Sequence, residues 1–206
     1  MACTRFSLVA AGMFLGVAAF GAAPAQAQTY TLPVGAQGNQ VFPDSLGMDF
    51  TVNSTVDISS LGAFTDGNSP IYVAIYKLAG DGTEVASATI NGPVGSSAYS
   101  YAALASTLVL APGNYQIVAW GYNGGNGDYN PDQGGGVGQA SFNSDDGALT
   151  QGGAYYGYDA GAIATTFDAY TDTYGAGNFV IPEPASLALL ALPLAAVALT
   201  RRRRPD

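Results

Sequence analysis

Apolar side chains alternate with their neighbours along several short stretches of this 206-residue chain. The alternation covers residues 48–53 (MDFTVN), 71–76 (IYVAIY) and 117–120 (IVAW). A period of two belongs to a β-strand, in which successive side chains point to opposite faces of the sheet. In the second and third stretches both faces carry apolar or aromatic groups, which is typical of strands that are covered on both sides or lie at a sheet interface. The pattern predicts strands and excludes a helical bundle.

Glycine-rich turns separate these strands. The segment 79–83 (AGDGT) contains an Asp-Gly pair, which supports the positive φ angles of a tight hairpin turn, and 112–114 (PGN) predicts a second such turn. Strand candidates recur about every 10 to 12 residues, a spacing typical of antiparallel sandwiches and jelly rolls. We therefore expect an all-β ectodomain with an antiparallel β-sandwich or jelly-roll-like fold. Residues 97–105 (SAYSYAALA) leave a strand and a short helical turn both open.

The composition changes after Trp120. Residues 121–139 are rich in Gly, Asn and Asp, and this composition predicts a long loop rather than a regular strand. Strand-like sequence resumes in four later stretches, at residues 140–142, 154–158, 162–167 and 178–181.

The first 27 residues have the pattern of a signal peptide. Arg5 provides the positive charge, residues 6–23 form an apolar run, and Ala25 and Ala27 frame a small-x-small cleavage pattern. We expect a signal helix that is cut between Ala27 and Gln28, which implies export. The alternative is an uncleaved anchor helix.

Cleavage of the signal peptide would remove Cys3 and leave a chain that contains neither cysteine nor histidine. This composition excludes disulfides, Cys or His zinc sites, a cysteine nucleophile and a Ser-His-Asp triad. Residues 28–180 also contain thirteen acidic residues and one base, Lys77. Nucleic acid is not an expected partner, because phosphate binding requires clustered Lys and Arg.

Three oxygen-bearing side chains at alternate positions suggest a calcium site in the long loop. Asp128, Asn130 and Asp132 resemble the opening of a calcium-binding loop. The match then fails, since Gln133 stands where that loop needs glycine and Gln139 where it needs glutamate. A looser Ca²⁺ site on these oxygens and a solvated turn without metal are the two remaining interpretations. No other cofactor is expected.

A set of tyrosines lies beside the same loop. Aromatic rings can cover the face of a sugar while nearby Asp, Asn and Gln side chains bind its hydroxyl groups. The alternative is a structural role, because tyrosine is common in strands, where it packs its ring and exposes its hydroxyl. The candidate glycan contacts are Tyr122, Tyr129, Tyr155, Tyr156 and Tyr158.

Catalysis is not expected. Without histidine, the remaining reaction is glycoside hydrolysis by two carboxylates. Glu84 is the only glutamate among residues 28–180, and it follows a predicted turn, where we expect it to be solvated. We expect a protein that is not an enzyme, with a weak glycoside hydrolase as the alternative.

The C-terminus predicts a short transmembrane helix. Residues 185–200 are uncharged, and as a helix they would span about 24 Å, against a hydrocarbon core of about 30 Å. The arginines that follow would stay in the cytoplasm and extend the helix by snorkelling. This basic cluster consists of Arg201, Arg202, Arg203 and Arg204. The helix is either a temporary anchor or a permanent one.

The order of these C-terminal features resembles a known sorting signal. Pro182, Glu183 and Pro184, followed by the apolar run and Arg201–Arg204, are similar to the PEP-CTERM signal of Gram-negative bacteria. Pro193 is a departure from that pattern and should kink the helix. The resemblance implies recognition by an exosortase, a membrane-embedded processing enzyme, in a bacterium that makes extracellular polysaccharide. It implies a transient stay in the inner membrane, followed by release to the outer surface or matrix.

Residues 47–122 are also similar, more loosely, to a β-rich module often found ahead of such tails. The matching segments are GMDFTVNS, ISSLGAF, IYVAIYKLAGDGTEVASATI and LVLAPGNYQIVAWGY. The resemblance implies a sandwich fold in an extracellular matrix and no catalytic residue. We thus divide the chain into a signal peptide (1–27), an ectodomain (28–180) and a sorting signal (181–206). The expected role is structural or binding, linked to exopolysaccharide and biofilm, and the alternative is a carbohydrate-binding module for that polysaccharide.

Overall fold

The computed structural model of the chain describes residues 26–80, 82–168 and 173–182. Most of the predicted signal peptide and almost all of the sorting signal, including Glu183, Pro184 and Arg201–Arg204, lie outside the described residues. Across the described ranges, no helix is both long and apolar enough to cross a membrane.

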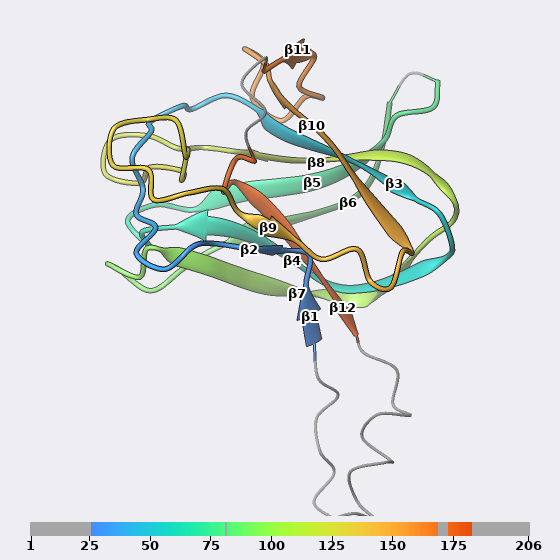
Figure 1. Cartoon of the computed structure of the whole chain (residues 1–206). Helices are drawn as coiled ribbons and strands as arrows, with labels where there is room; N and C mark the ends of the chain where they lie inside the picture. The colour runs from blue at the N-terminus through green and yellow to red at the C-terminus, as the bar shows by residue number, and fades with distance from the viewer. Residues whose placement is uncertain (1–25, 81, 169–172, 183–206) are drawn as a thin grey trace, which may run out of the picture.

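The described part of the chain is all-β, as the alternation predicts, and its strands pair antiparallel in several sheets (Figure 1). One sheet has the strand order β1-β12-β4-β7, a second has the order β11-β10-β3-β8-β5-β6, and β2 pairs with β9. The strands are β1 (Gln26–Gln28), β2 (Tyr30–Thr31), β3 (Leu46–Val52), β4 (Val56–Thr65), β5 (Ile71–Lys77), β6 (Thr83–Ile90), β7 (Ala98–Leu110), β8 (Gly113–Trp120), β9 (Ser141–Phe142), β10 (Leu149–Tyr156), β11 (Thr166–Phe167) and β12 (Gly177–Pro182).

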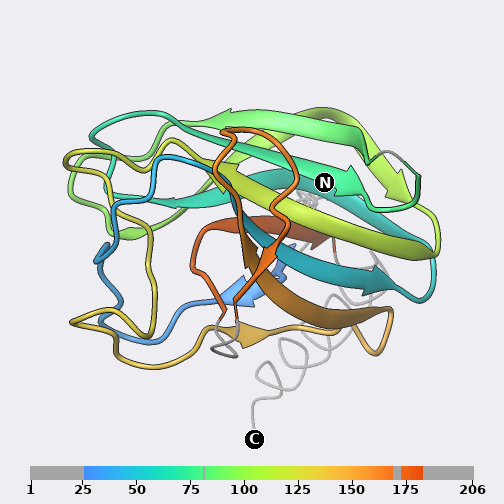
Figure 2. The ribbon, with the colours of Figure 1, turned by 90° about the horizontal axis from the view of Figure 1, so that it is seen from above.

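The three predicted alternating stretches form the centre of the six-stranded sheet. Strands β3, β8 and β5 are neighbours there, and β10 lies on the other side of β3 (Figure 2). Strands β5 and β6 pair antiparallel, as expected of a hairpin. The second predicted turn is not a hairpin, because β7 belongs to the four-stranded sheet and β8 to the six-stranded one. Residues 111 and 112 instead connect one sheet to the other.

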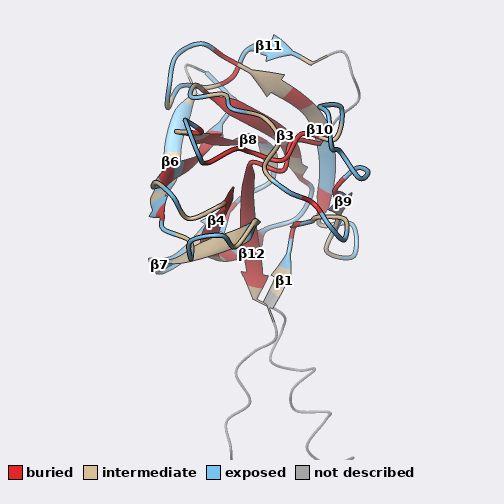
Figure 3. Ribbon diagram, turned by 90° about the vertical axis from the view of Figure 1, so that its left-hand side faces the viewer, coloured by how far each residue is buried: buried red, intermediate tan, exposed pale blue. Residues whose placement is uncertain are grey.

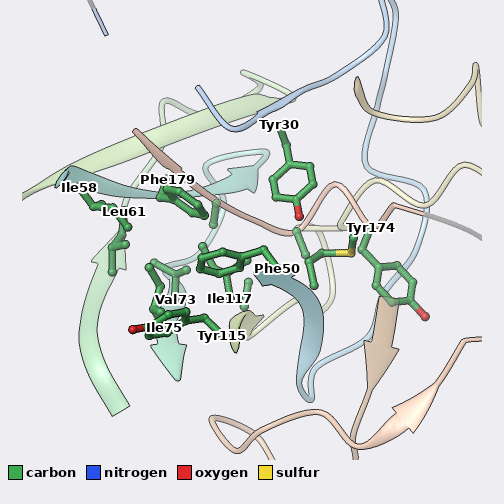
Figure 4. Packing of buried hydrophobic residues seen from close by; sticks show 14 of the residues in the cluster. Tyr30, Phe50, Ile58, Leu61, Val73, Ile75, Tyr115, Ile117, Tyr174 and Phe179 are labelled. Atoms are coloured by element: carbon green, nitrogen blue, oxygen red, sulfur yellow. The ribbon is translucent and has the colours of Figure 1, made fainter. Parts of the chain in front are cut away.

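The two larger sheets share one apolar core. Phe50 of β3 lies 4.9 Å from Phe179 of β12 and 5.7 Å from Tyr115 of β8, measured between ring centroids (Figure 4). Leu61 from β4 and Ile117 from β8 belong to the same buried cluster. Aromatic pairs of this kind add about 0.5–1.5 kcal/mol beyond the burial of their surface. Contacts between side chains of both sheets therefore stabilise the fold.

Strand β7 settles the open choice for residues 97–105 in favour of a strand. Residues 98–103 pair with β4, and Tyr101 lies opposite Gly62, where an added Cβ would collide with its ring. This pairing with a distant strand is tertiary, so local sequence could not reveal it.

The later strands differ in their bounds from those predicted. Strand β10 begins at Leu149, before the expected start at residue 154, and β11 contains only Thr166 and Phe167 of the expected 162–167. The extra residues of β10 include a bulge at Gly152 and Gly153, which interrupts the alternation that marks a strand. The loop 121–139 is confirmed, with only isolated bridges at Asp128 and Tyr129.

Strands β1 and β12 bring the two ends of the described chain together. Gln26 pairs with Pro182, Ala27 with Ile181 and Gln28 with Val180. The chain therefore enters and leaves at the same end, opposite the end that carries β11 (Figures 1 and 3).

Candidate binding cleft

A cleft of about 730 Å³ is lined in part by Phe167 of β11. Strand β11 lies at the end of the molecule opposite β1 and β12 (Figure 1). The cleft joins four segments that are far apart in sequence: the stretch before β3, the long loop, the end of β10, and the region from β11 onward. The lining combines aromatic rings with amide and carboxylate side chains. Its residues are Gln40, Phe42, Leu46, Asn130, Asp132, Gln133, Tyr156, Phe167, Asp168 and Tyr174.

Strands β10 and β11 position the aromatic wall. Tyr156 ends β10, and Phe42 meets its ring edge to face at a centroid distance of 6.2 Å. Tyr158 continues this group 5.8 Å from Tyr156 and is 71% exposed. Phe167, directly opposite Tyr155 in the β10–β11 pair, is 56% exposed. The cleft thus presents rings whose surfaces reach solvent.

A buried glutamine fixes the segment that leads into β11. The side chain of Gln116 on β8 accepts a hydrogen bond from the backbone N–H of Ala164 at 2.8 Å and donates one to the Ala164 carbonyl at 3.0 Å. Only Thr165 separates Ala164 from β11, which contains the exposed Phe167. Gln116 therefore anchors the aromatic wall to the central strand of the sheet.

Amide hydrogen bonds hold the polar wall in place. Asn39 accepts a hydrogen bond from the backbone N–H of Asn130 (2.8 Å) and donates one to the Asn130 carbonyl (2.7 Å). The Asn130 side chain donates to Gln40 Oε1 at 2.9 Å and accepts from the backbone N–H of Asp132. Tyr129 secures the same loop by donating to the Gly138 carbonyl at 2.6 Å. The loop wall is thus ordered before any ligand binds.

The cleft is acidic. Asp132 and Asp168 are the charged residues of its lining, and the Tyr174 hydroxyl donates to Asp168 Oδ2. Lys77 is the one basic residue within the described ranges, and it does not line the cleft. The field in the cleft therefore favours neutral or positively charged ligands.

The structure divides the five predicted glycan tyrosines. Tyr156 lines the cleft and Tyr158 packs beside it, while Tyr155 is half-buried against Phe167. Tyr122 and Tyr129 are fully buried, so a surface role for these two must be corrected: their rings belong to the core. Tertiary contacts decide this, because the sequence gives all five the same polar, glycine-rich setting.

The three predicted calcium ligands lie in different environments. Asp128 is buried, Asn130 forms part of the cleft wall, and Asp132 is exposed. The interpretation of this segment as a solvated turn is therefore wrong for Asp128 and Asn130, because both side chains are buried. Within the described ranges, no cluster of three or more His, Cys, Asp or Glu residues is present. Calcium binding at these oxygens stays a prediction.

Asp128 is an unusual carboxyl group. Neither of its oxygens has a hydrogen-bond partner, and burial raises its pKa well above the ordinary aspartate value. The hydroxyl groups of Tyr30, Tyr99 and Tyr122 are also buried without a partner. Burial is the main cause of the raised pKa of Tyr122, and the charge of Asp128 adds to it. Such groups are most stable when they are neutral.

Sequence reasoning named only Asn130, Asp132 and Tyr156 as candidates among the described lining residues. The cleft is also lined by residues outside the sequence neighbourhood that suggested a glycan site: Gln40, Phe42, Leu46, Phe167, Asp168 and Tyr174. Only the composition of the long loop pointed toward this region. Glu84, the one candidate for carboxylate catalysis, is exposed on β6 and is not a lining residue.

Comparison with known proteins adds no relative. No family model matches the chain, and neither the curated proteins nor the solved structures contain a match.

Proposed function

We propose that this chain is an exported protein of the cell surface or extracellular matrix whose C-terminal tail is processed by an exosortase. Its β-domain acts by binding or as a structural component, linked to exopolysaccharide and biofilm, and not as an enzyme. The proposal includes the sandwich or jelly-roll-like architecture and the flanking signal and transmembrane helices. It rests on the signal-peptide pattern and on the resemblance to PEP-CTERM tails.

The pairing of β1 with β12 is the structural observation that supports this proposal. Ala27, the residue before the predicted signal-peptide cut, pairs with Ile181, the residue before the PEP motif. Both predicted processing points thus meet at one end of the domain. Because the cleft is lined by β11, at the end opposite β1 and β12 (Figure 1), a chain held by its tail would present the cleft away from the membrane.

The fold also tolerates both predicted cuts. Removal of Gln26 and Ala27 leaves Gln28 opposite Val180 at the edge of the four-stranded sheet. Strand β12 keeps its pairing with β4 through residues 177–180, and Phe179 stays in the core. Processing at both ends would therefore remove only part of β1 and of the residues after β12, and the core would stay intact.

The arginines provide the experiment. Replacing Arg201–Arg204 with serine should abolish tail processing, because the short apolar run would lose the charges that stop and orient it in the membrane. Replacing the same four residues with lysine keeps those charges and is the matched control. Gel mobility and fractionation of the producing cells would report cleavage and location.

The lysine variant should be processed like the wild type, and the serine variant should keep its tail. Equal processing of both variants would refute the role of the positive charge. Wild-type protein that stays uncut in cells with an exosortase would refute the proposed sorting.

A carbohydrate-binding module is the second candidate function. The observation that favours it is the cleft, which places exposed rings beside amide groups.

A further inference from the structure

We infer that the cleft binds a glycan built from uncharged or amino sugars and discriminates against uronic-acid chains. The inference rests on the binding role proposed above, and it does not depend on how the tail is processed. It is carried by the aromatic wall, the amide groups and the lack of a basic side chain among the described lining residues.

The aromatic wall supplies a surface for the apolar face of a sugar ring. Phe167 is more than half exposed and Tyr156 is half-buried, so part of each ring is open to solvent. Aromatic rings pack well against the C–H faces of pyranoses, since both surfaces are flat and apolar. Strand β10 pairs with β3 and β11 pairs with β10, while Gln116 holds Ala164 just before β11, so the surface is preformed.

The facing wall supplies hydrogen bonds of both kinds. The side chains of Gln40 and Gln133 each contain an amide, which can offer donors and acceptors to sugar hydroxyls. The buried Asn130 amide holds this wall in place through its bonds to Gln40 and to the Asp132 backbone. Asn39 already orders the backbone at Asn130, so a ligand need not bear the full entropic cost of ordering this loop. A cleft of about 730 Å³ lies within the size range of small-molecule sites.

Charge decides which sugars fit. Asp132 and Asp168 lie in the cleft, and no Lys or Arg in the described part of its lining would compensate the carboxylate of a bound uronate. Repulsion between like charges in a partly desolvated site opposes such a ligand. A hydroxyl group or a sugar ammonium group would instead donate to these carboxylates.

The test is direct binding of defined oligosaccharides to the purified full chain. The chain is held in a detergent without a sugar headgroup, so that the detergent cannot compete for the cleft. The probes are hexamers of a neutral β-glucan, of glucosamine and of galacturonate. The neutral or the amino-sugar hexamer should bind at least tenfold more tightly than the galacturonate hexamer.

Three variants locate the ligand. Phe167→Ala should weaken binding at least tenfold, because it removes part of the aromatic surface on which the sugar packs. The ring is more than half exposed, so its removal should have little effect on the core. Asp132→Asn should reduce the difference in affinity between the neutral and the acidic hexamers, because it removes a negative charge from the cleft. Tyr72→Ala is the control, since Tyr72 is also exposed but stacks on Trp120 outside the cleft, with ring centroids 5.7 Å apart.

Four results would overturn the inference: tighter binding of the galacturonate hexamer, no binding of either other probe, loss of binding in Tyr72→Ala, or unchanged binding in Phe167→Ala. Circular dichroism of each variant would exclude misfolding as a cause. Failure here would leave the arginine experiment unaffected, so the ligand and the sorting are tested separately.

Discussion

At the scale of single residues, Asp128 is the group whose environment departs most from what the sequence predicts. A run of Asp, Asn and Gly suggests solvent, yet both carboxyl oxygens are buried without a partner. An isolated β-bridge between Asp128 and Gln40 explains this burial. Two backbone hydrogen bonds between these residues hold Asp128 against the segment before β3. A distant partner determines the burial, and sequence spacing does not encode it.

The raised pKa of Asp128 makes stability depend on pH. The folded protein favours the neutral Asp128 carboxyl group, because burial opposes its charge. The stabilisation that this neutral group gives is fully present below the unfolded pKa of about 3.9 and is lost as pH rises through the folded pKa. Asp128→Asn should therefore raise the melting temperature relative to the wild type more at pH 8 than at pH 4. Thermal unfolding of both proteins across this range would measure the difference.

A difference between the two proteins that is independent of pH would contradict this account. Asp49, whose pKa burial also raises, is unchanged in both proteins and so cancels in the comparison. A bound cation would give another pattern: millimolar Ca²⁺ would raise the melting temperature of the wild type, and Asp128→Asn would remove that rise.

At the scale of the elements, strands with a regular alternation could be predicted and irregular ones could not. Strands β3, β5 and β8 lie where the pattern places them, since each buries a face against the core. Strand β7 has small residues on both faces, and β10 contains a glycine bulge, so neither shows a clear period. Strand β7 is stabilised by pairing with β4, and β10 by pairing with β3. These tertiary contacts are visible only in the folded structure.

The bulge in β10 gives a prediction at this scale. An added Cβ at Gly152 would lie 2.7 Å from the Cβ of Asp49 and 2.9 Å from its carbonyl oxygen, on the neighbouring strand β3. Gly152→Ala should therefore lower the free energy of unfolding by about 1–3 kcal/mol. Chemical denaturation would measure this loss.

Gly134→Ala is the matched control, because nothing lies within 4 Å of a Cβ at that position in the long loop. It should change stability by no more than about 0.5 kcal/mol. Equal effects of the two substitutions would show that β10 does not pack on β3 as closely as described.

At the scale of the whole molecule, the sequence predicts the processing signals but not the arrangement of the domain between them. The cleft joins residues between 40 and 174, and no local pattern links them. The pairing of Ala27 with Ile181 is equally invisible in the sequence, although both residues adjoin predicted cleavage motifs. The fold pairs Ala27 with Ile181 at one end of the molecule, and the cleft includes β11 at the other end.

The central claim is that the anchor is temporary, and the intact mass of the wild-type protein recovered from the cell surface tests it most directly. The account predicts a chain that begins at Gln28 and ends near Pro182, without the apolar run and without Arg201–Arg204. Such a chain would leave the membrane with an acidic domain and no hydrophobic tail. A mass that includes Arg204 would contradict the account and identify the C-terminal segment as a permanent anchor.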